Sequence, residues 1–290
     1  MDKSTIIGIL GPTASGKTKY AVELAYKLDA EIISMDSRQV YRGLDIGTGK
    51  DLHEYTINGK EIPYHLIDIV DIDTPYHLHQ FKLDFEKAYQ SIVSRGKQVI
   101  ACGGTGLYFD ILLNDRSFTA VPVNDGLRAE LITYSHDELI NIIKVENKSE
   151  HLFDSSTKKR SIRAIEIIRY LEHHSLPESK ASAIHNWELH LLDVSVQERN
   201  KRIDERLKSR VAAGLFEEVE NLINKGVSTD RLIYLGLEYK FITQYFLGQF
   251  TKEECIERLQ IAIHQFAKRQ MTFFRKIEKE GHLFKLRIKN

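Results

Sequence analysis

Residues 11–18 read Gly-Pro-Thr-Ala-Ser-Gly-Lys-Thr and match all four fixed positions of the phosphate-loop pattern G-x-x-x-x-G-K-[ST]. The apolar run 4–10 before this loop predicts a short buried strand, and residues 17–28 after it have the spacing of an amphipathic helix. A glycine loop between a strand and a helix binds phosphate because its backbone N–H groups and the helix N-terminus face the anion. The chain is therefore expected to bind a di- or triphosphate.

The loop residues have distinct expected roles. Gly11 and Gly16 allow a tight turn, Lys17 places a cation on the outer phosphate oxygens, and the Thr18 hydroxyl can hold Mg²⁺. Mg²⁺ is the one cofactor expected, and Thr18 is its expected protein ligand. The diphosphate-binding residues expected from the loop are Gly11, Pro12, Thr13, Ala14, Ser15, Gly16, Lys17 and Thr18.

Composition narrows the class of protein. Two cysteines in 290 residues exclude a disulfide scaffold and a four-cysteine zinc site. No stretch approaches the roughly 18 apolar residues of a membrane span, and no apolar leader is visible, so a cytoplasmic protein without a membrane partner is expected. The net charge is zero, yet residues 257–290 hold nine basic and three acidic side chains. This basic excess indicates either a polyanionic partner or a solvated helix face.

Strands and helices alternate in the first part of the chain. Further strands are predicted at 31–34, 65–70 and 98–101, with a helix at 79–94 between the last two. A glycine turn at 103–106 then leads into a short helix. This alternation predicts an α/β fold, a parallel sheet of the phosphate-loop NTPase type flanked by helices. Ligands of such sheets bind at the carboxyl ends of the strands, where the glycine loop lies.

The pattern changes near residue 120. Helical spacing at 127–133, 137–145 and 158–173 is followed by a return strand at 185–194. Long amphipathic helices come last, over 198–225, 239–247 and 252–280, with glycines between or within them. We expect residues 120–185 to form an all-helical insertion that contacts the polyanionic partner. Residues 1–119 and 186–290 would form the α/β core with its helical C-terminal region.

The second strand ends at Asp36, which should point into the cleft beside the glycine loop. A carboxylate there can act as a general base or a Mg²⁺ ligand, or it can cap the following segment. The strand at 98–101 is followed by Cys102 and Gly103, with no acid where phosphate-loop NTPases hold Mg²⁺. A chain without hydrolysis machinery can instead hold a diphosphate as a leaving group.

Several segments together resemble the tRNA dimethylallyltransferase family, the bacterial tRNA isopentenyltransferases. They span nearly the whole chain, and the most specific are Asp-Ser-Arg-Gln-Val-Tyr and Gly-Gly-Thr-Gly-Leu-Tyr. They are residues 11–18, 33–41 (Ile-Ser-Met-Asp-Ser-Arg-Gln-Val-Tyr), 44–48 (Leu-Asp-Ile-Gly-Thr), 103–108 (Gly-Gly-Thr-Gly-Leu-Tyr), 160–166 (Arg-Ser-Ile-Arg-Ala-Ile-Glu), 214–219 (Gly-Leu-Phe-Glu-Glu-Val) and 267–270 (Ala-Lys-Arg-Gln).

The resemblance implies a reaction. This family transfers a dimethylallyl group from dimethylallyl diphosphate to N6 of adenosine 37, in tRNAs that read codons beginning with U. It implies that Asp36 is the general base, that Thr105 lies near the reacting adenine, and that Lys17 stabilises the leaving diphosphate. Arg206 is expected to reach the diphosphate as well, with Arg202, one helical turn earlier, as its rival.

The resemblance also implies contact with the tRNA anticodon stem-loop. Phosphate contacts of basic side chains give affinity and salt sensitivity, although the same residues could be ordinary solvated charges. A monomer without zinc is expected. The expected tRNA-binding residues are Asp36, Ser37, Arg38, Gln39, Thr105, Arg128, Lys159, Arg160, Arg163, Lys268, Arg269 and Gln270.

The chain departs from the family pattern mostly in the segments expected to face RNA, such as Gly236-Leu237 in place of Gly-Tyr and Ile263-His264 in place of Thr-Arg. Three other functions stay open. An adenylate isopentenyltransferase would share the cleft without needing the basic tail. A small-molecule kinase would carry an arginine-rich lid, and a non-catalytic RNA-binding module would not need Lys17, Asp36 and Thr105 together.

Overall fold

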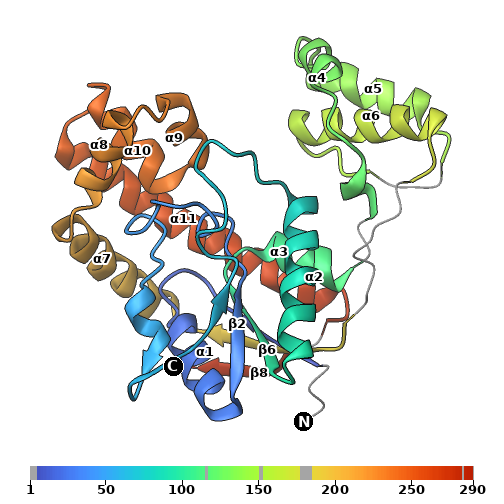
Figure 1. Cartoon of the computed structure of the whole chain (residues 1–290). Helices are drawn as coiled ribbons and strands as arrows, with labels where there is room; N and C mark the ends of the chain where they lie inside the picture. The colour runs from blue at the N-terminus through green and yellow to red at the C-terminus, as the bar shows by residue number, and fades with distance from the viewer. Residues whose placement is uncertain (1–4, 115–116, 150–152, 177–184, 283, 290) are drawn as a thin grey trace. The chain divides into compact units, whose positions relative to one another are not determined.

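The computed structural model describes residues 5–114, 117–149, 153–176, 185–282 and 284–289. Contacts divide the chain into two compact units, one of Met1–Asn114 with Ala183–Asn290 and one of Asp115–Ser182. Figure 1 shows the strands gathered in the larger unit, and the smaller unit is helical throughout its described part.

A six-stranded sheet forms the centre of the larger unit, in the order β5-β2-β6-β1-β7-β8. Every pairing in it is parallel. The expected α/β fold with a parallel sheet is therefore confirmed. Strands covered on both faces read as continuous apolar runs, as β1 does with Ile-Ile-Gly-Ile-Leu. The strands are β1 Ile6–Leu10, β2 Ala30–Ser34, β5 Tyr64–His65, β6 Gln98–Gly103, β7 Trp187–Asp193 and β8 Phe284–Lys289.

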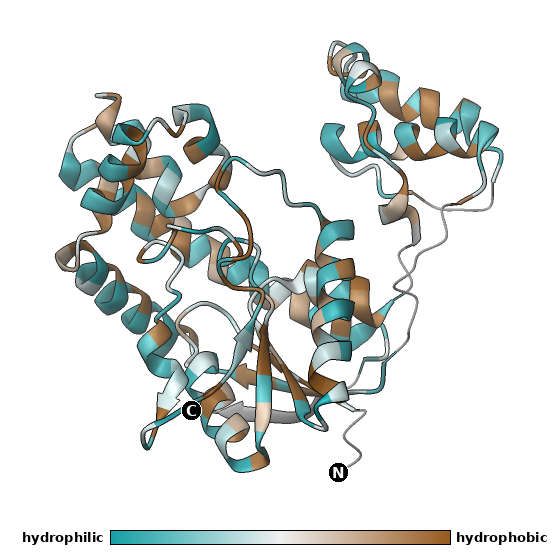
Figure 2. Ribbon diagram, in the orientation of Figure 1, coloured by the Kyte–Doolittle hydropathy of each residue, from teal (hydrophilic) through white to brown (hydrophobic). Residues whose placement is uncertain are grey.

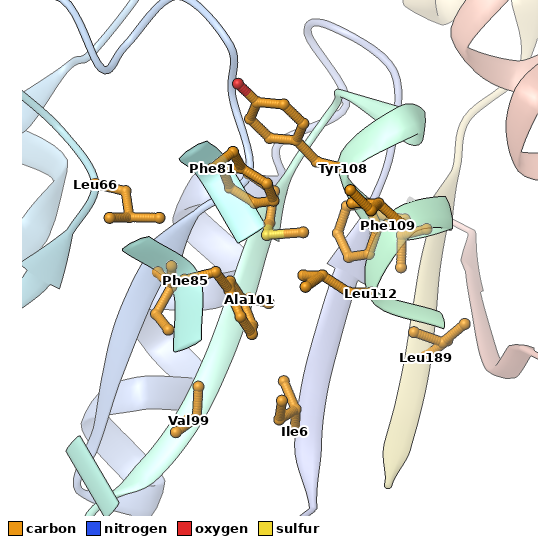
Figure 3. Packing of buried hydrophobic residues seen from close by; sticks show 14 of the residues in the cluster. Ile6, Leu66, Phe81, Phe85, Val99, Ala101, Tyr108, Phe109, Leu112 and Leu189 are labelled. Carbon is orange, nitrogen blue, oxygen red and sulfur yellow. The ribbon is translucent and has the colours of Figure 1, made fainter. Parts of the chain in front are cut away.

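Helices cover both faces of this sheet. α1 (Lys17–Leu28) packs on one face through Ala21, Val22 and Ala25. α2 (Leu78–Ser94) and α3 (Gly106–Leu113) cover the other, together with the C-terminal part of α11 (Lys252–Lys279). Figure 3 shows this second core, in which the Phe81 ring stacks on Tyr108 at 3.5 Å between centroids.

The C-terminal helices of the larger unit have a separate core, built from residues such as Leu207, Leu215, Tyr239 and Leu259. In Figure 2 hydrophobic residues gather along the strands and on one side of several helices, as amphipathic spacing predicts. The helices are α7 Val196–Ala212, α8 Leu215–Asn224, α9 Thr229–Leu235, α10 Leu237–Phe246 and the first half of α11.

Some sequence expectations were wrong in detail. The strand expected over 65–70 stops at His65, because Leu66 and Asp68 have left-handed backbone angles, φ 62° and 56°. The helix expected over 198–225 is two helices, since Gly214 adopts φ 101° and ends the first. The helix α9 and the strand β8 were not foreseen. Residues 52–61, also unforeseen, form a 3₁₀ helix (η1, Leu52–Tyr55) and the hairpin of β3 (Thr56–Ile57) and β4 (Lys60–Glu61).

The smaller unit is a helical bundle with a short 3₁₀ turn, η2 (Ser117–Ala120). Its three α-helices begin at side-chain caps from Asn124, Ser135 and Thr157, which satisfy free N–H groups. Leu131, Leu139, Ile162 and Ile165 form its core. The helices are α4 Asp125–Leu131, α5 His136–Glu146 and α6 Lys158–His173. Across all described residues, no helix is both long and apolar enough to cross a membrane.

Candidate active site

A cleft of about 690 Å³ opens in the larger unit. Its walls include residues that follow β1, β2 and β6, so it lies at the carboxyl edge of the sheet, where ligands of open α/β sheets bind. The helices α7, α10 and α11 complete the walls. The phosphate loop, Asp36 and Thr105 all line this one cleft, as their sequence positions predicted.

The phosphate loop turns tightly between β1 and α1. Gly16 takes a left-handed conformation (φ 82°) at the helix start, which glycine adopts without strain. Lys17 opens α1, and its Nζ lies 3.4 Å from the carbonyl oxygen of Pro12. Burial lowers the pKa of Lys17, and Arg206 adds to the lowering, while Cys102 and Asp36 oppose it. A cation held in this way is poorly solvated and gains strongly from a bound anion.

Arg206 of α7, rather than Arg202, touches the loop. Its Nη2 donates a hydrogen bond to the Thr13 hydroxyl. Burial and the nearby Arg210 lower the pKa of Arg206 to about 10. Arg202 instead bonds Glu198 one turn back at 2.6 Å, with a third of its side chain exposed. Both line the cleft, but Arg206 is the one joined to the phosphate loop.

Asp36 lies two residues after the end of β2 and holds a turn. Its Oδ1 accepts hydrogen bonds from the backbone N–H groups of Arg38 at 2.8 Å and Gln39 at 3.3 Å. The cap expected as one alternative is thus present, although it caps a turn rather than a helix. Among the described residues, Oδ2 has no hydrogen-bond donor, so it remains able to take a proton. Thr105 lies next to this turn, and its Oγ1 accepts from the backbone N–H of Ser37 at 3.2 Å.

The side chains of Arg38 and Gln39 bind neighbouring segments of the protein. Arg38 Nε donates to the carbonyl oxygen of Leu235 at 2.7 Å. Gln39 accepts from the Ser34 hydroxyl at 2.8 Å and donates to the carbonyl oxygen of Gly49 at 3.0 Å. These bonds fasten the Asp36 turn to the end of α9 and to the loop 44–50.

Glu218 of α8 fixes that loop. Its carboxylate accepts from three consecutive backbone N–H groups, those of Asp45, Ile46 and Gly47, at 2.6–3.1 Å. The Tyr239 hydroxyl donates a fourth bond at 2.7 Å. These donors have no partner in a helix or strand ladder, so this one carboxylate helps to fix the conformation of the loop.

The predicted tRNA-binding residues of α11 separate into two kinds. Lys268 and Arg269 are exposed, and Arg269 also lines the cleft. Gln270 is buried, with 7% of its surface exposed, and bonds two loops of the protein. The sequence placed all three on one RNA-facing surface, whereas the helix turns Gln270 inward.

In the smaller unit, two of the predicted tRNA-binding arginines are engaged internally. Arg128 makes a bidentate pair with Glu166 at 2.8 Å for both bonds. Arg163 also meets Glu166, at 3.2 Å, and donates to three carbonyl oxygens in residues 118–122. Lys159 and Arg160 are exposed, with Arg160 paired to the exposed Asp154 at 2.8 Å. Of the four predicted tRNA-binding residues in this unit, Lys159 and Arg160 are therefore the more exposed.

Several cleft residues were missed from the sequence, among them the charged residues Arg210, Glu238 and Glu54. Arg210 and Glu238 are each 8% exposed and lie 3.7 Å apart. Burial raises the pKa of Glu238, and the nearby Arg210 opposes that rise. A signal for Arg210 existed, since Arg202, Arg206 and Arg210 repeat every four residues and so share one helix face.

The cleft also tests the expected metal site. Thr18 and Glu54 both line it, and hydroxyl and carboxylate oxygens are suitable ligands for Mg²⁺. In the described part of the chain, no three His, Cys, Asp or Glu side chains gather as a metal-binding group. This donor set fits Mg²⁺, which commonly keeps waters and substrate phosphates as ligands rather than a full protein cage.

The fold and the cleft define a phosphate-loop protein of the group-transfer class, whose cleft is lined by cations and by the carboxylate of Asp36. Comparison with known proteins gives the family. The model described as IPP transferase matches residues 39–277, and one described as isopentenyl transferase matches residues 4–62. The chain belongs to the IPP transferase family.

Named relatives agree with this assignment. A tRNA dimethylallyltransferase 2 from Phocaeicola vulgatus is 48% identical over 97% of this chain and 91% of its own length. Another from Bacteroides fragilis (strain ATCC 25285) is 46% identical over 95% and 90%. The resemblance drawn from the motifs, and the expectation of an enzyme of the prenyltransferase type, are confirmed.

Solved structures show the same fold. The tRNA isopentenylpyrophosphate transferase of Bacillus halodurans matches with a TM-score of 0.67 at 32% identity, over 94% of this chain and 87% of that one. A eukaryotic dimethylallyltransferase acting on tRNA matches with a TM-score of 0.80, over 98% of this chain and 73% of that one. At 24% identity this second likeness supports the fold alone.

Proposed function

We propose that this protein transfers a dimethylallyl group from dimethylallyl diphosphate to N6 of adenosine 37 in tRNAs that read codons beginning with U. The observation that carries the proposal is that two sets of groups line one cleft. Lys17 belongs to the phosphate loop and Arg206 bonds to it, while Asp36 and Thr105 follow the strands β2 and β6. The first set suits a diphosphate leaving group, and the second suits an amine that must lose a proton.

The reaction breaks one C–O bond and forms one C–N bond. The bond from the allylic carbon to the diphosphate oxygen breaks, and its electron pair leaves with the diphosphate. N6 of the adenine attacks that carbon, and its proton passes to Asp36, whose Oδ2 accepts no hydrogen bond from any described residue. Negative charge grows on the diphosphate as the bond breaks. The positive charges of Lys17 and Arg206, which are already in place, therefore stabilise the transition state.

Mg²⁺ is part of the proposal. Thr18, with Glu54 across the same cleft, would hold the ion, which supplies further positive charge to the diphosphate. The apolar part of the cleft would receive the dimethylallyl group and keep water from the reacting carbon. Its lining includes Leu237, Phe241, Ile263 and Phe266.

Exposed basic residues would bind the RNA. Lys268 and Arg269 of α11 and Lys159 and Arg160 of the smaller unit are the cations for the anticodon stem-loop phosphates. The adenine must leave the stack of the loop to reach Asp36, as chemistry on a base requires. In the same proposal the protein acts as a monomer in the cytoplasm and uses no zinc.

Labelled dimethylallyl diphosphate tests this function. Purified protein with Mg²⁺ receives it together with unmodified tRNA containing A36-A37-A38, with AMP, or with ATP, in separate reactions. We expect label on the tRNA alone. Label on AMP or ATP would instead assign a nucleotide prenyltransferase, and label on none of the three would overturn the proposal.

A further inference from the structure

Gln270 joins the two sides of the cleft through its carboxamide. Oε1 accepts a hydrogen bond from the backbone N–H of Thr13 at 2.8 Å. Nε2 donates to the carbonyl oxygen of Gly104 at 2.9 Å. Thr13 belongs to the phosphate loop after β1, and Gly104 belongs to the turn after β6, so one side chain of α11 ties two strand ends together.

Hydrogen bonds continue from Gln270 toward the diphosphate side. The N–H of Thr13 is taken by Gln270, so it is not available to a phosphate oxygen. The hydroxyl of the same residue accepts from Arg206. Thr13 therefore fixes the position of Arg206 relative to Gln270 rather than offering its backbone N–H to the ligand.

A matching connection runs toward the proposed base. Thr105 follows Gly104 directly, and its Oγ1 accepts from the N–H of Ser37 at 3.2 Å. The Thr105 N–H donates to the carbonyl oxygen of Met35 at 3.2 Å. These two bonds hold Thr105 against the residues on both sides of Asp36. Gln270 thus stands midway between the leaving-group side and the base side of the cleft.

The glycines of the β6–α3 turn make this contact possible. A Cβ on Gly104 would lie 2.3 Å from Nε2 of Gln270. A Cβ on Gly106 would lie 2.5 Å from the Phe273 ring, also on α11. A side chain at either position would therefore force the Gln270 carboxamide or the Phe273 ring out of its present place. The Gly-Gly-Thr-Gly segment is therefore shaped to receive α11 as well as to end the strand.

The chemistry of the contact is specific to an amide. Thr13 presents a donor and Gly104 an acceptor, so the partner between them must accept at one atom and donate at the other. Glutamate would accept from Thr13 but would place a second acceptor against the Gly104 carbonyl. Methionine would fill the space and satisfy neither group, and each buried group without a partner carries a desolvation penalty.

We propose that Gln270 is a positioning residue for the transfer step, which fixes the separation between the phosphate loop and Asp36, and that it does not contact tRNA. This inference rests on the proposed function. Small displacements between reacting groups reduce rates steeply, by about a hundredfold for 1 Å. Loss of the clamp should therefore lower the rate of transfer in the bound complex and leave tRNA affinity unchanged.

Gln270→Glu and Gln270→Met test the inference against matched changes at Gln265, an exposed glutamine of the same helix. Single-turnover rates are measured with both substrates saturating, and tRNA dissociation constants by filter binding. We expect each Gln270 variant to lose at least tenfold in rate while its tRNA affinity stays within twofold of wild type. The Gln265 variants should match wild type in both measurements.

A second variant guards against misfolding at position 270. In Gly104→Ala the added methyl group displaces the Gln270 carboxamide from the opposite loop. This variant should show the same pattern, a slower single-turnover transfer with unchanged tRNA affinity. Weaker tRNA binding at an unchanged saturated rate would show that Gln270 contacts RNA and would overturn the inference. If wild type is active and the Gln270 variants are equally active, the inference about Gln270 is overturned while the proposed function stands. If wild type is inactive, both the proposed function and the inference are overturned.

Discussion

Replacing Arg206 with methionine should leave the stability of the unliganded protein equal or higher and should weaken the binding of dimethylallyl diphosphate. Burial holds the pKa of Arg206 at about 10, below its ordinary value. At about 1.4 kcal/mol per pKa unit, the charged guanidinium costs the folded protein about 3 kcal/mol. Because the lowered pKa belongs to a cation, this cost is fully present at neutral pH and is lost only as the pH rises toward 10 and beyond.

The hydrogen bond to Thr13 offsets part of this destabilisation, by about 1 kcal/mol for a bond of this kind. The free energy of unfolding of the Arg206→Met variant should therefore equal that of wild type or exceed it by up to about 2 kcal/mol. For a chain of this size, each 1 kcal/mol corresponds to about 2–4 °C in melting temperature.

Ligand binding should change in the opposite direction. A charge-assisted hydrogen bond to the diphosphate contributes about 1.5–3 kcal/mol, so its loss weakens binding about 10–150-fold. Dimethylallyl diphosphate at 100 times the wild-type Kd stabilises wild type by about 2.7 kcal/mol. At the same concentration the variant would gain only about 0.3–1.4 kcal/mol.

Thermal melts with and without dimethylallyl diphosphate measure both effects. Arg202→Met, one turn earlier on α7, is the matched control, and we expect its unliganded melting temperature and its ligand-induced shift to stay near wild type, since Arg202 pairs with Glu198 in a partly exposed bridge. The reasoning is refuted if Arg206→Met melts more than about 4 °C below wild type without ligand, or if its ligand-induced shift equals that of wild type.

Three further predictions concern other parts of the site. Asp36→Asn should lower kcat by about 10²–10⁴-fold with tRNA affinity within twofold, measured by steady-state kinetics and filter binding; a near-normal kcat would remove Asp36 as the base. The double variant Lys268→Ala/Arg269→Ala should weaken tRNA binding and reduce its salt dependence, whereas the control Lys201→Ala/Lys208→Ala on α7 should do neither. If the salt dependence of tRNA binding is the same in the two double variants, α11 does not contact RNA. Glu218→Gln should lower the free energy of unfolding by about 1–3 kcal/mol, because three N–H groups of the loop 44–50 depend on its carboxylate; an unchanged denaturant midpoint would contradict this role.

Much of the cleft was predictable from sequence because it follows from strand ends. The helix after the phosphate loop has the expected bounds, Lys17–Leu28. Asp36 and Thr105 each follow a strand of a parallel sheet, and the carboxyl ends of parallel strands share one edge. Local patterns were enough to bring these residues together.

Other features depended on contacts that no local pattern reveals. The bond from Glu218 to the loop 44–50 joins residues more than 170 positions apart. Left-handed angles at Leu66 and Asp68 end β5 early; aspartate adopts such angles more readily than most residues, but leucine rarely does, so the apolar pattern gave no sign of them. Charge alone also did not reveal that Arg163, a predicted RNA contact, donates hydrogen bonds to carbonyl oxygens of its own unit.

Gln270 is an intermediate case. It follows two exposed basic residues, so its local composition predicts a solvated position. Helical spacing predicts the opposite, because Ala267, Gln270 and Phe274 recur at intervals of three and four residues on one face. The structure follows the spacing, and the polar side chain is kept on that face by its two hydrogen bonds.

The most direct test of the account is the mass of the anticodon-loop fragment after reaction. Unmodified tRNA containing A36-A37-A38 is treated with the protein, Mg²⁺ and dimethylallyl diphosphate, digested with a ribonuclease, and sequenced by tandem mass spectrometry. The account predicts one added dimethylallyl group, carried by the base of adenosine 37, in the wild-type reaction and its near absence with Asp36→Asn. An unmodified fragment, or a group on another nucleotide, would contradict it.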